Sequence, residues 1–204
     1  MTVGELAKMF NAEKKMGVEL QVIKMRGYER GQWYDETGLL WLSPSPNLKT
    51  LTAAILYPGV AMVEGANVSV GRGTKTPFEL LGAPWMNGEE LASYLNKRNV
   101  QGIEFIPVDF KPKSGRFKNQ VCHGVQIALL NRQILDSPAL GIEITSALYR
   151  LYPKGFQIDK TLGMIGSRKI LQAIKAGQDP ATIMVNWQEP LEQFCVLRSK
   201  YLLY

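Results

Sequence analysis

The sequence has very little of what metal sites and disulfide-rich proteins are built from. Among its 204 residues there are one histidine, His123, and two cysteines, Cys122 and Cys195, which lie far apart in the chain. One histidine excludes a cluster of histidine ligands. Two distant cysteines lack the spacing of a zinc site or of a disulfide framework. We therefore expect no metal and no other cofactor.

Long apolar runs are also absent. No uninterrupted apolar stretch of about 18 residues occurs, which predicts that no helix of this chain spans a membrane. Residues 1–5 contain neither the basic region nor the apolar region with which a signal peptide begins. We expect no export signal in this chain.

The single histidine limits catalysis by a serine triad, because any such triad would have to use His123. It lies in a Val-Cys-His-Gly-Val segment that reads as a strand, and no nucleophile elbow accompanies it. A structural histidine is the favoured interpretation.

The charge is moderately basic, with a net charge of +6. The basic residues are scattered, as in Lys111, Lys113, Arg116 and Lys118, and do not form one stripe along a helix. Proteins that bind nucleic acids usually carry a clustered basic patch with interleaved aromatic residues. The sequence shows no such cluster, so no nucleic-acid partner is expected. The charge is compatible with a modest attraction for anionic ligands.

Strand and helix patterns alternate along the chain. A Thr2–Glu5 capping box opens the first helix, Asn87 caps another, and Pro180 opens the last one. The expected strands are 19–25, 60–63, 103–110 and 120–130, and the further expected helices are 50–57, 78–81, 89–97, 138–152 and 167–176. The interleaving predicts an α/β or α+β fold with a mixed β-sheet flanked by helices and a long C-terminal helix.

The most informative segment runs from Glu64 to Pro77. It is polar and glycine-rich, with Arg72 between Gly71 and Gly73, so its backbone can reach positive φ and approach a ligand closely. It lacks the Gly-Lys-Ser/Thr ending of a phosphate-binding Walker loop. Both a binding loop and a plain structural loop are compatible with this composition.

Large aromatic residues stand near polar segments. Trp33, Tyr34 and Trp41 follow the first expected strand, and Trp85 comes after the glycine-rich segment. Such rings either cap a core or form a platform on which a sugar ring stacks, and the sequence does not choose between the two.

Several segments together resemble one family, the NamZ-like exo-β-N-acetylmuramidases. The matching segments are residues 1–7, 44–47, 57–59, 64–74, 77–78, 82–85 and 200–204, together with Trp187, Phe194 and Arg198. The resemblance covers essentially the whole chain and implies that residues 1–204 form a single domain like the C-terminal domain of that family. It also implies that an N-terminal Rossmann-like domain, which carries the catalytic acid, is absent.

The resemblance implies hydrolysis of terminal, non-reducing N-acetylmuramic acid from peptidoglycan fragments, in a cleft shared with the N-terminal domain. Glu64 is then the candidate stabiliser or base, and the alternative is that it braces its own loop. Arg72 is the candidate for binding the lactyl carboxylate, and the alternative is an ion pair with Glu64. Asn67 is a candidate sugar ligand. Ser69 and Thr74 are candidate hydroxyl contacts, although each is also suited to satisfying the loop backbone.

Two functions of different classes follow from this resemblance. The first is the C-terminal domain of a muramidase, inactive alone and completed by the N-terminal domain of its parent protein. The second is a standalone module that binds muramyl sugars without catalysis. A place in the cell envelope is expected for the parent protein.

Overall fold

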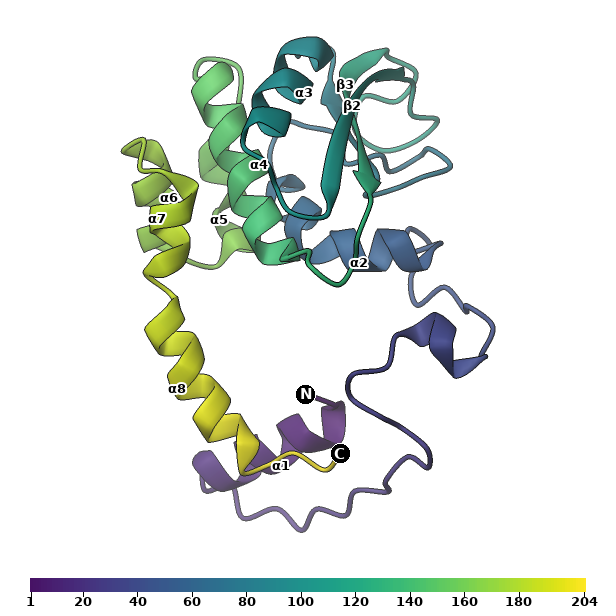
Figure 1. Cartoon of the computed structure of the whole chain (residues 1–204), viewed down its shortest axis with the longest axis vertical. Coiled ribbons are helices and arrows are strands. Elements are labelled where there is room, and N and C mark those ends of the chain that lie inside the picture. The colour runs from purple at the N-terminus through teal and green to yellow at the C-terminus, as the bar shows by residue number, and fades with distance from the viewer. The chain divides into compact units, whose positions relative to one another are not determined.

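The computed structural model describes all residues from 1 to 204, and the chain divides into two compact units (Figure 1). The smaller unit combines Met1–Leu39 with Met184–Tyr204, and the larger unit is Leu40–Ile183. No helix combines the length and apolar character needed to cross a membrane.

The larger unit is built on a three-stranded sheet of β1 (Leu80–Ala83), β2 (Ile103–Phe110) and β3 (Cys122–Leu129). The strand order is β1-β3-β2 and both pairings are antiparallel. β1 and β2 therefore run in the same direction, with β3 inserted between them, as in a split βαβ unit. The expected α/β fold of a β-sheet flanked by helices is confirmed. The sheet was expected to be mixed, and both of its strand pairings are antiparallel.

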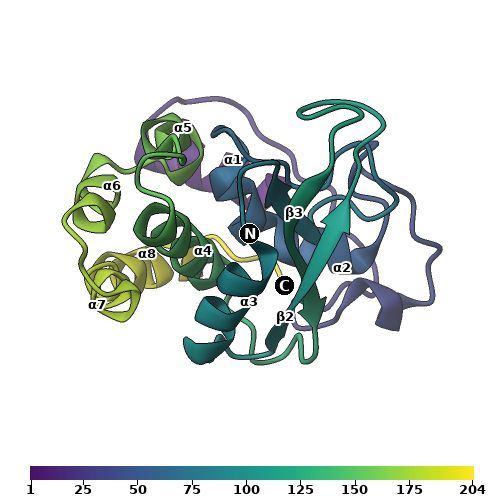
Figure 2. The ribbon, with the colours of Figure 1, turned by 90° about the horizontal axis from the view of Figure 1, so that it is seen from above.

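Seven helical segments accompany the sheet in the larger unit. They are α2 (Leu51–Val60), α3 (Gly88–Lys97), α4 (Ser137–Leu151), α5 (Leu162–Ile165), α6 (Arg168–Lys175) and the 3₁₀ helices η2 (Ala61–Val63) and η3 (Ile158–Thr161). An eighth, α7 (Pro180–Val185), crosses into the smaller unit. α3 packs against β2 and β3, and α4 packs against α2 and α3 (Figure 2). The core lies between these layers and includes Leu56, Leu81, Phe105, Ile127, Ile142 and Leu148.

Side-chain caps begin most of these helices. Thr50 accepts from the N–H of Ala53 at 3.0 Å, and Asn87 accepts from that of Glu90 at 3.1 Å. Asp136 begins α4 in the same way. Each cap satisfies an N–H group that has no partner within its own helix, which is why the expected starts of these helices agree closely with the structure.

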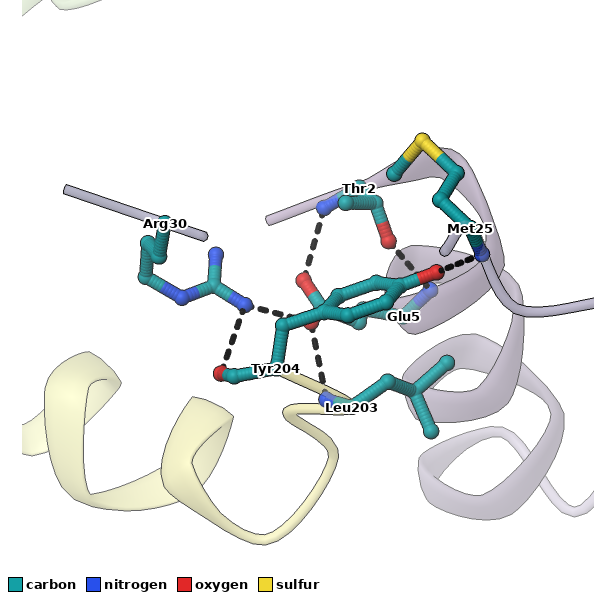
Figure 3. Close-up of polar contacts among 6 residues, drawn as sticks. All are labelled: Thr2, Glu5, Met25, Arg30, Leu203 and Tyr204. Carbon is teal, nitrogen blue, oxygen red and sulfur yellow. Dashed lines mark hydrogen bonds and ion pairs between the residues drawn. The ribbon is translucent and has the colours of Figure 1, made fainter. Parts of the chain in front are cut away.

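The smaller unit contains α1 (Val3–Glu13), the 3₁₀ helix η1 (Tyr34–Thr37) and α8 (Gln188–Ser199). The Thr2–Glu5 capping box is present, with the N–H of Thr2 donating to Glu5 at 2.7 Å. The fully buried Glu5 also pairs with Arg30 and accepts from the N–H of Leu203 at 2.8 Å (Figure 3). This one carboxylate therefore joins the first helix to the last residues of the chain.

Three expected elements are wrong. Residues 19–25 form no strand; Val22 instead packs on α1, where a Cβ added to Gly4 would lie 2.5 Å from it. Residues 60–63 continue helically from α2 into η2, and residues 80–83 form β1 where a helix over 78–81 was expected. In both of the last two cases pairing or packing with distant residues overrides the local pattern.

The expected last helix is divided. α7 ends at Val185 and α8 begins at Gln188, and α8 has no buried residue within this chain. The apolar side chains that recur at helical spacing along this segment include Ile183, which is 2% exposed, and Phe194, which is 38% exposed. The part of this apolar face in α8 is therefore exposed, whereas the part in α7 is buried at Ile183.

Candidate functional site

The glycine-rich segment forms a loop between η2 and β1. Its backbone is tied to β1 by the reciprocal bonds of Ser69 with Gly82, 2.8 and 3.0 Å long. Gly71 and Gly73 have φ values of 77° and 81°, as their positions beside Arg72 suggested. Gly73 also packs tightly, because a Cβ there would lie 2.4 Å from the carbonyl oxygen of Ser114. The loop is therefore a fixed structure that presents Arg72.

Arg72 and Glu64 face each other across this loop. Arg72 Nε donates to Glu64 Oε1, and Nη2 donates to Oε2 at 3.1 Å. The guanidinium carbon lies 5.1 Å from the centre of the Phe78 ring, in the range of a cation–π contact. Hydrogen bonding to Glu64, reinforced by its charge and opposed by burial, raises the pKa of Arg72. The Arg72–Glu64 ion pair named as an alternative is therefore formed.

The pair is accessible to solvent in part, since the side chains of Arg72 and Glu64 are 40% and 23% exposed. Only the Nε–Nη2 edge of the guanidinium faces Glu64. A guanidinium has five N–H groups, so Nη1 and the second N–H of Nη2 stay available. The pair thus has the chemistry to hold Glu64 on one side and an anion on the other.

Asn67 joins the loop to a distant segment. Its Nδ2 donates to the carbonyl of Gly155 at 2.8 Å, and its Oδ1 accepts from the N–H of Gln157 at 2.8 Å. Both ends of the amide are used within the protein. This contact is a clamp between the loop and the segment that precedes η3.

The two hydroxyl candidates bond within the loop. Ser69 is buried, and its Oγ accepts from the N–H of Gly71 at 3.3 Å. Thr74 Oγ1 donates to the carbonyl of Gly71 at 2.6 Å and accepts from the N–H of Thr76 at 3.2 Å. Of the five residues predicted for the site, the structure brings Glu64 and Arg72 together, and the other three hold the loop in shape.

Among the candidate aromatic residues, Trp85 is connected to the loop. Its ring lies against Gly155, which also accepts the Asn67 bond, and forms an edge contact with Tyr152 at 5.4 Å between centroids. Its indole nitrogen is buried without a hydrogen-bond partner. Trp41 bonds to the carbonyl of Leu48 at 3.2 Å, and Trp33 and Tyr34 belong to the smaller unit.

A basic groove, which the sequence did not predict, borders the loop. It measures about 510 Å³ and is lined by four lysines, Lys49, Lys75, Lys111 and Lys113. Gly73 and Thr74 form part of its wall, and no acidic side chain lines it. The lysines come from three separate segments, so their gathering could not be read from sequence spacing. The groove favours anions beside Arg72.

A second groove lies where α3 begins. It measures about 560 Å³ and is lined by Asn87, Glu89, Asp109 and His123, among others. His123 lies in β3, as expected, directly opposite Asp109 in β2, with 2.7 Å between Nδ1 and Oδ1. No group of three or more histidine, cysteine or acidic side chains is placed to hold a metal ion.

Comparison with known proteins identifies the family. The model of the C-terminal part of the exo-β-N-acetylmuramidase NamZ matches residues 55–204, and the model of its N-terminal part matches residues 1–52. The chain therefore belongs to the NamZ exo-β-N-acetylmuramidase family. The expectation that the chain resembles only the C-terminal half is corrected, because residues 1–52 match the model of the N-terminal part.

Individual relatives agree with this assignment. The chain is 35% identical over 207 residues to the peptidoglycan β-N-acetylmuramidase NamZ of Bacillus subtilis, covering all of this chain and 50% of that protein. Crystal structures of two DUF1343 family proteins from Bacteroides fragilis are similar as well. One has a TM-score of 0.85 at 27% identity over 98% of this chain, and the other 0.75 at 28% over 100%. This chain covers 55% of each of those two chains, so it spans about half the length of its relatives.

Proposed function

We propose that this chain is part of a muramidase that hydrolyses terminal, non-reducing N-acetylmuramic acid from peptidoglycan fragments. Its loop from Glu64 to Thr74 supplies one side of an active-site cleft, and the remainder of the protein supplies the other. The observation that carries this proposal is the Arg72–Glu64 pair, held on a glycine-flanked loop in a member of the NamZ family.

The chemistry divides between two groups. Glycoside hydrolysis generally uses one acid to protonate the leaving oxygen and a second group on the other side of the anomeric carbon. In our proposal the acid lies outside this chain, and Glu64 stabilises positive charge at the anomeric carbon or activates water. Arg72 holds the Glu64 carboxylate in position through hydrogen bonds to both of its oxygens.

Arg72 also recognises the substrate. N-acetylmuramic acid carries a lactyl carboxylate, and a planar guanidinium binds carboxylates at two points. The edge that faces away from Glu64 is available for this contact, and the basic groove beside Thr74 increases the local concentration of anions. Asn67 holds the loop against the segment before η3, and its role in our proposal is to position Glu64 and Arg72.

Exposed apolar side chains in the smaller unit indicate that it contacts a further domain. Val3 and Ile23 are 84% and 88% exposed, and Met16, Val18 and Leu39 are each at least half exposed. Several large apolar side chains exposed in one small unit favour an interface with another domain. We propose that the remaining half of the family's chain covers it, and that the 204 residues alone are inactive.

The test uses the full-length protein with a chromogenic β-N-acetylmuramide. Glu64→Gln is expected to lower kcat by roughly 100-fold or more, as removal of a group that stabilises charge in the transition state does. Glu104→Gln, which changes an exposed carboxylate on β2, is the matched control. Wild-type turnover in a folded Glu64→Gln protein would overturn the catalytic role.

The basic groove favours a second function, a module that binds muramyl sugars without catalysis. This function predicts saturable binding by the 204-residue chain and no hydrolysis by the full-length protein. Hydrolysis by the full-length protein that disappears in Glu64→Gln would exclude it.

A further inference from the structure

A separate pocket lies on the other side of α4 from the sheet. It measures about 440 Å³ and is formed where α3, α4 and the turn between α6 and α7 meet. Figures 1 and 2 show α6 and α7 on the side of α4 away from β2 and β3. Its lining shares no residue with the loop from Glu64 to Thr74. Its volume falls within the range of about 300–1,000 Å³ that is usual for small-molecule sites.

Arg98 and Asp179, one of its two carboxylate partners, line this pocket. Its Nε and Nη2 donate to both oxygens of Glu143, at 2.9 and 3.0 Å, and Nη1 and Nη2 donate to both oxygens of Asp179, at 2.9 and 3.1 Å. Hydrogen bonding to Arg98 lowers the pKa of Asp179. The interaction ties α3 to α4 and to the start of α7. Because Arg98, Glu143 and Asp179 pair with one another, we assign them a structural role in the pocket wall and no direct role in binding a ligand.

Two polar groups on the pocket face of α4 are left without partners. The hydroxyl oxygen of Ser146 is buried and makes no hydrogen bond, whereas the neighbouring Thr145 donates to the carbonyl of Gly141 at 2.7 Å. Arg150 is exposed to solvent and makes no hydrogen bond or ion pair within the chain, so its guanidinium is available, whereas the hydroxyl of Ser146 is the buried group. A buried polar group without a partner is costly, and a ligand that bonds to it removes that cost.

The spacing of these residues directs them to one place. Ser146, Tyr149 and Arg150 lie at positions i, i+3 and i+4 of α4, so they share one face of the helix. Tyr94 of α3 and Ile174 of α6 complete the wall. The pocket therefore combines a hydroxyl, an available guanidinium, two phenol rings and an apolar side.

We propose that this pocket binds a small sugar acid: a single ring whose carboxylate pairs with Arg150 and whose hydroxyl or amide group bonds to Ser146. Tyr94 and Tyr149 contact the ring. We assign a carboxylate to the ligand because Arg150 has no acidic partner in the protein. The two nearby acidic side chains, Glu143 and Asp179, are both paired with Arg98 instead. The choice of a sugar as the ring rests on the proposed function. The site itself is new, because it lies outside the loop to which hydrolysis is assigned.

The test is calorimetric or NMR titration of the 204-residue chain with N-acetylmuramic acid. N-acetylglucosamine, which lacks the lactyl carboxylate, serves as the neutral comparison. Wild-type protein is expected to bind the acid more tightly than the neutral sugar. Arg150→Gln is expected to weaken binding of the acid roughly tenfold or more, the loss of one charge-assisted hydrogen bond, and to leave the neutral sugar unchanged. Ser146→Ala is expected to weaken both.

Arg168→Gln is the matched control, because Arg168 is an exposed arginine on α6 outside the pocket lining. In NMR the shifted signals should belong to residues 94, 146, 149 and 150. Binding that survives Arg150→Gln and Ser146→Ala unchanged, or no binding by the folded wild type, would overturn the pocket.

The two proposals fail in different ways. The NMR shifts at residues 94, 146, 149 and 150 should persist in Arg72→Ala, because Arg72 lies outside the pocket lining. Binding that is lost in Arg72→Ala but retained in Arg150→Gln would place the sugar at the loop and overturn the pocket. Hydrolysis by the full-length protein depends on Glu64, so loss of the hydrolytic proposal leaves the titration result standing.

Discussion

Arg72 meets Glu64 with one edge of its guanidinium, through Nε and Nη2, while its Nη1 end stays uncommitted. This orientation permits the same arginine to brace the loop and to face a ligand. It also separates two roles experimentally, because a lysine retains the charge of arginine but not its fork geometry.

Arg72→Lys in the full-length protein should therefore raise KM for a muramyl substrate by roughly tenfold or more, with a smaller effect on kcat. The comparison of Michaelis constants for Arg72→Lys and for Arg116→Lys, an exposed arginine in the loop after β2, measures the specific contribution. An Arg72→Lys enzyme with unchanged KM would show that the fork does not bind substrate.

Asn67 contributes to stability through two hydrogen bonds that no other residue supplies. Asn67→Ala removes the bonds to Gly155 and Gln157, and should lower the free energy of unfolding of the larger unit by about 1–3 kcal/mol. Urea unfolding of the 204-residue chain measures this change. Gln126→Ala, which truncates an exposed amide on β3, should change stability by less than about 0.5 kcal/mol. Equal midpoints for the two variants would mean that the clamp does not stabilise the loop.

The sequence predicts what depends on neighbours in the chain. The caps at Thr2 and Asn87 satisfy N–H groups three residues away, and the strand over 103–110 alternates along its own length, so each is visible locally. β1 spans four residues and exists through its register with β3, where Leu81 is opposite Val125. Residues 19–25 have a strand-like pattern but no partner strand here, and that pattern misleads.

The same distinction applies to the site. The pairing of Arg72 with Glu64 spans eight residues and was foreseeable as an alternative. The Asn67 clamp reaches residues 88 and 90 positions away. The four lysines of the basic groove come from three segments. Contacts of this kind depend on tertiary packing, which the residues of one segment do not encode by themselves.

Two glycines set the distance between α2 and α4. A Cβ on Gly59 would lie 2.1 Å from the carbonyl oxygen of Ser137, and one on Gly141 would lie 2.7 Å from that of Gly59. Gly141→Ala should therefore separate the helices and lower the free energy of unfolding by about 1–3 kcal/mol, the usual effect of overpacking.

Gly163 provides the control for this prediction. It lies in α5 with no atom within 4 Å of the position that a Cβ would occupy. Gly163→Ala should be neutral or stabilising by up to about 1 kcal/mol, because alanine favours helix. The two variants should thus change the thermal midpoint in opposite directions or by clearly different amounts. A Gly141→Ala protein as stable as Gly163→Ala would show that the two helices can separate without cost.

Glu5 makes the stability of the smaller unit depend on pH. Burial alone would raise the pKa of Glu5, but the N–H groups of Leu203 and Thr2 and the guanidinium of Arg30 outweigh it, and together they lower that pKa from 4.5 to about 2. A carboxyl group that is more acidic when folded stabilises the folded state above its unfolded pKa. That contribution is lost as the pH falls toward the folded value. We expect the stability of the smaller unit to be constant above about pH 5 and to fall between 4.5 and 2.

Glu5→Gln should remove this dependence, because the amide does not titrate. The variant should be less stable than wild type near neutral pH, since Arg30 then loses its charged partner, and the difference should narrow as the solution becomes more acidic. The amide of Leu203 donates to Glu5, so its hydrogen-exchange rate directly reports the loss of the Glu5 contacts as the pH falls. Glu19→Gln, at an exposed position of the same unit, should keep the wild-type profile. If wild type and Glu5→Gln lost protection in parallel across this pH range, the carboxylate would not be what joins the end of the chain to α1.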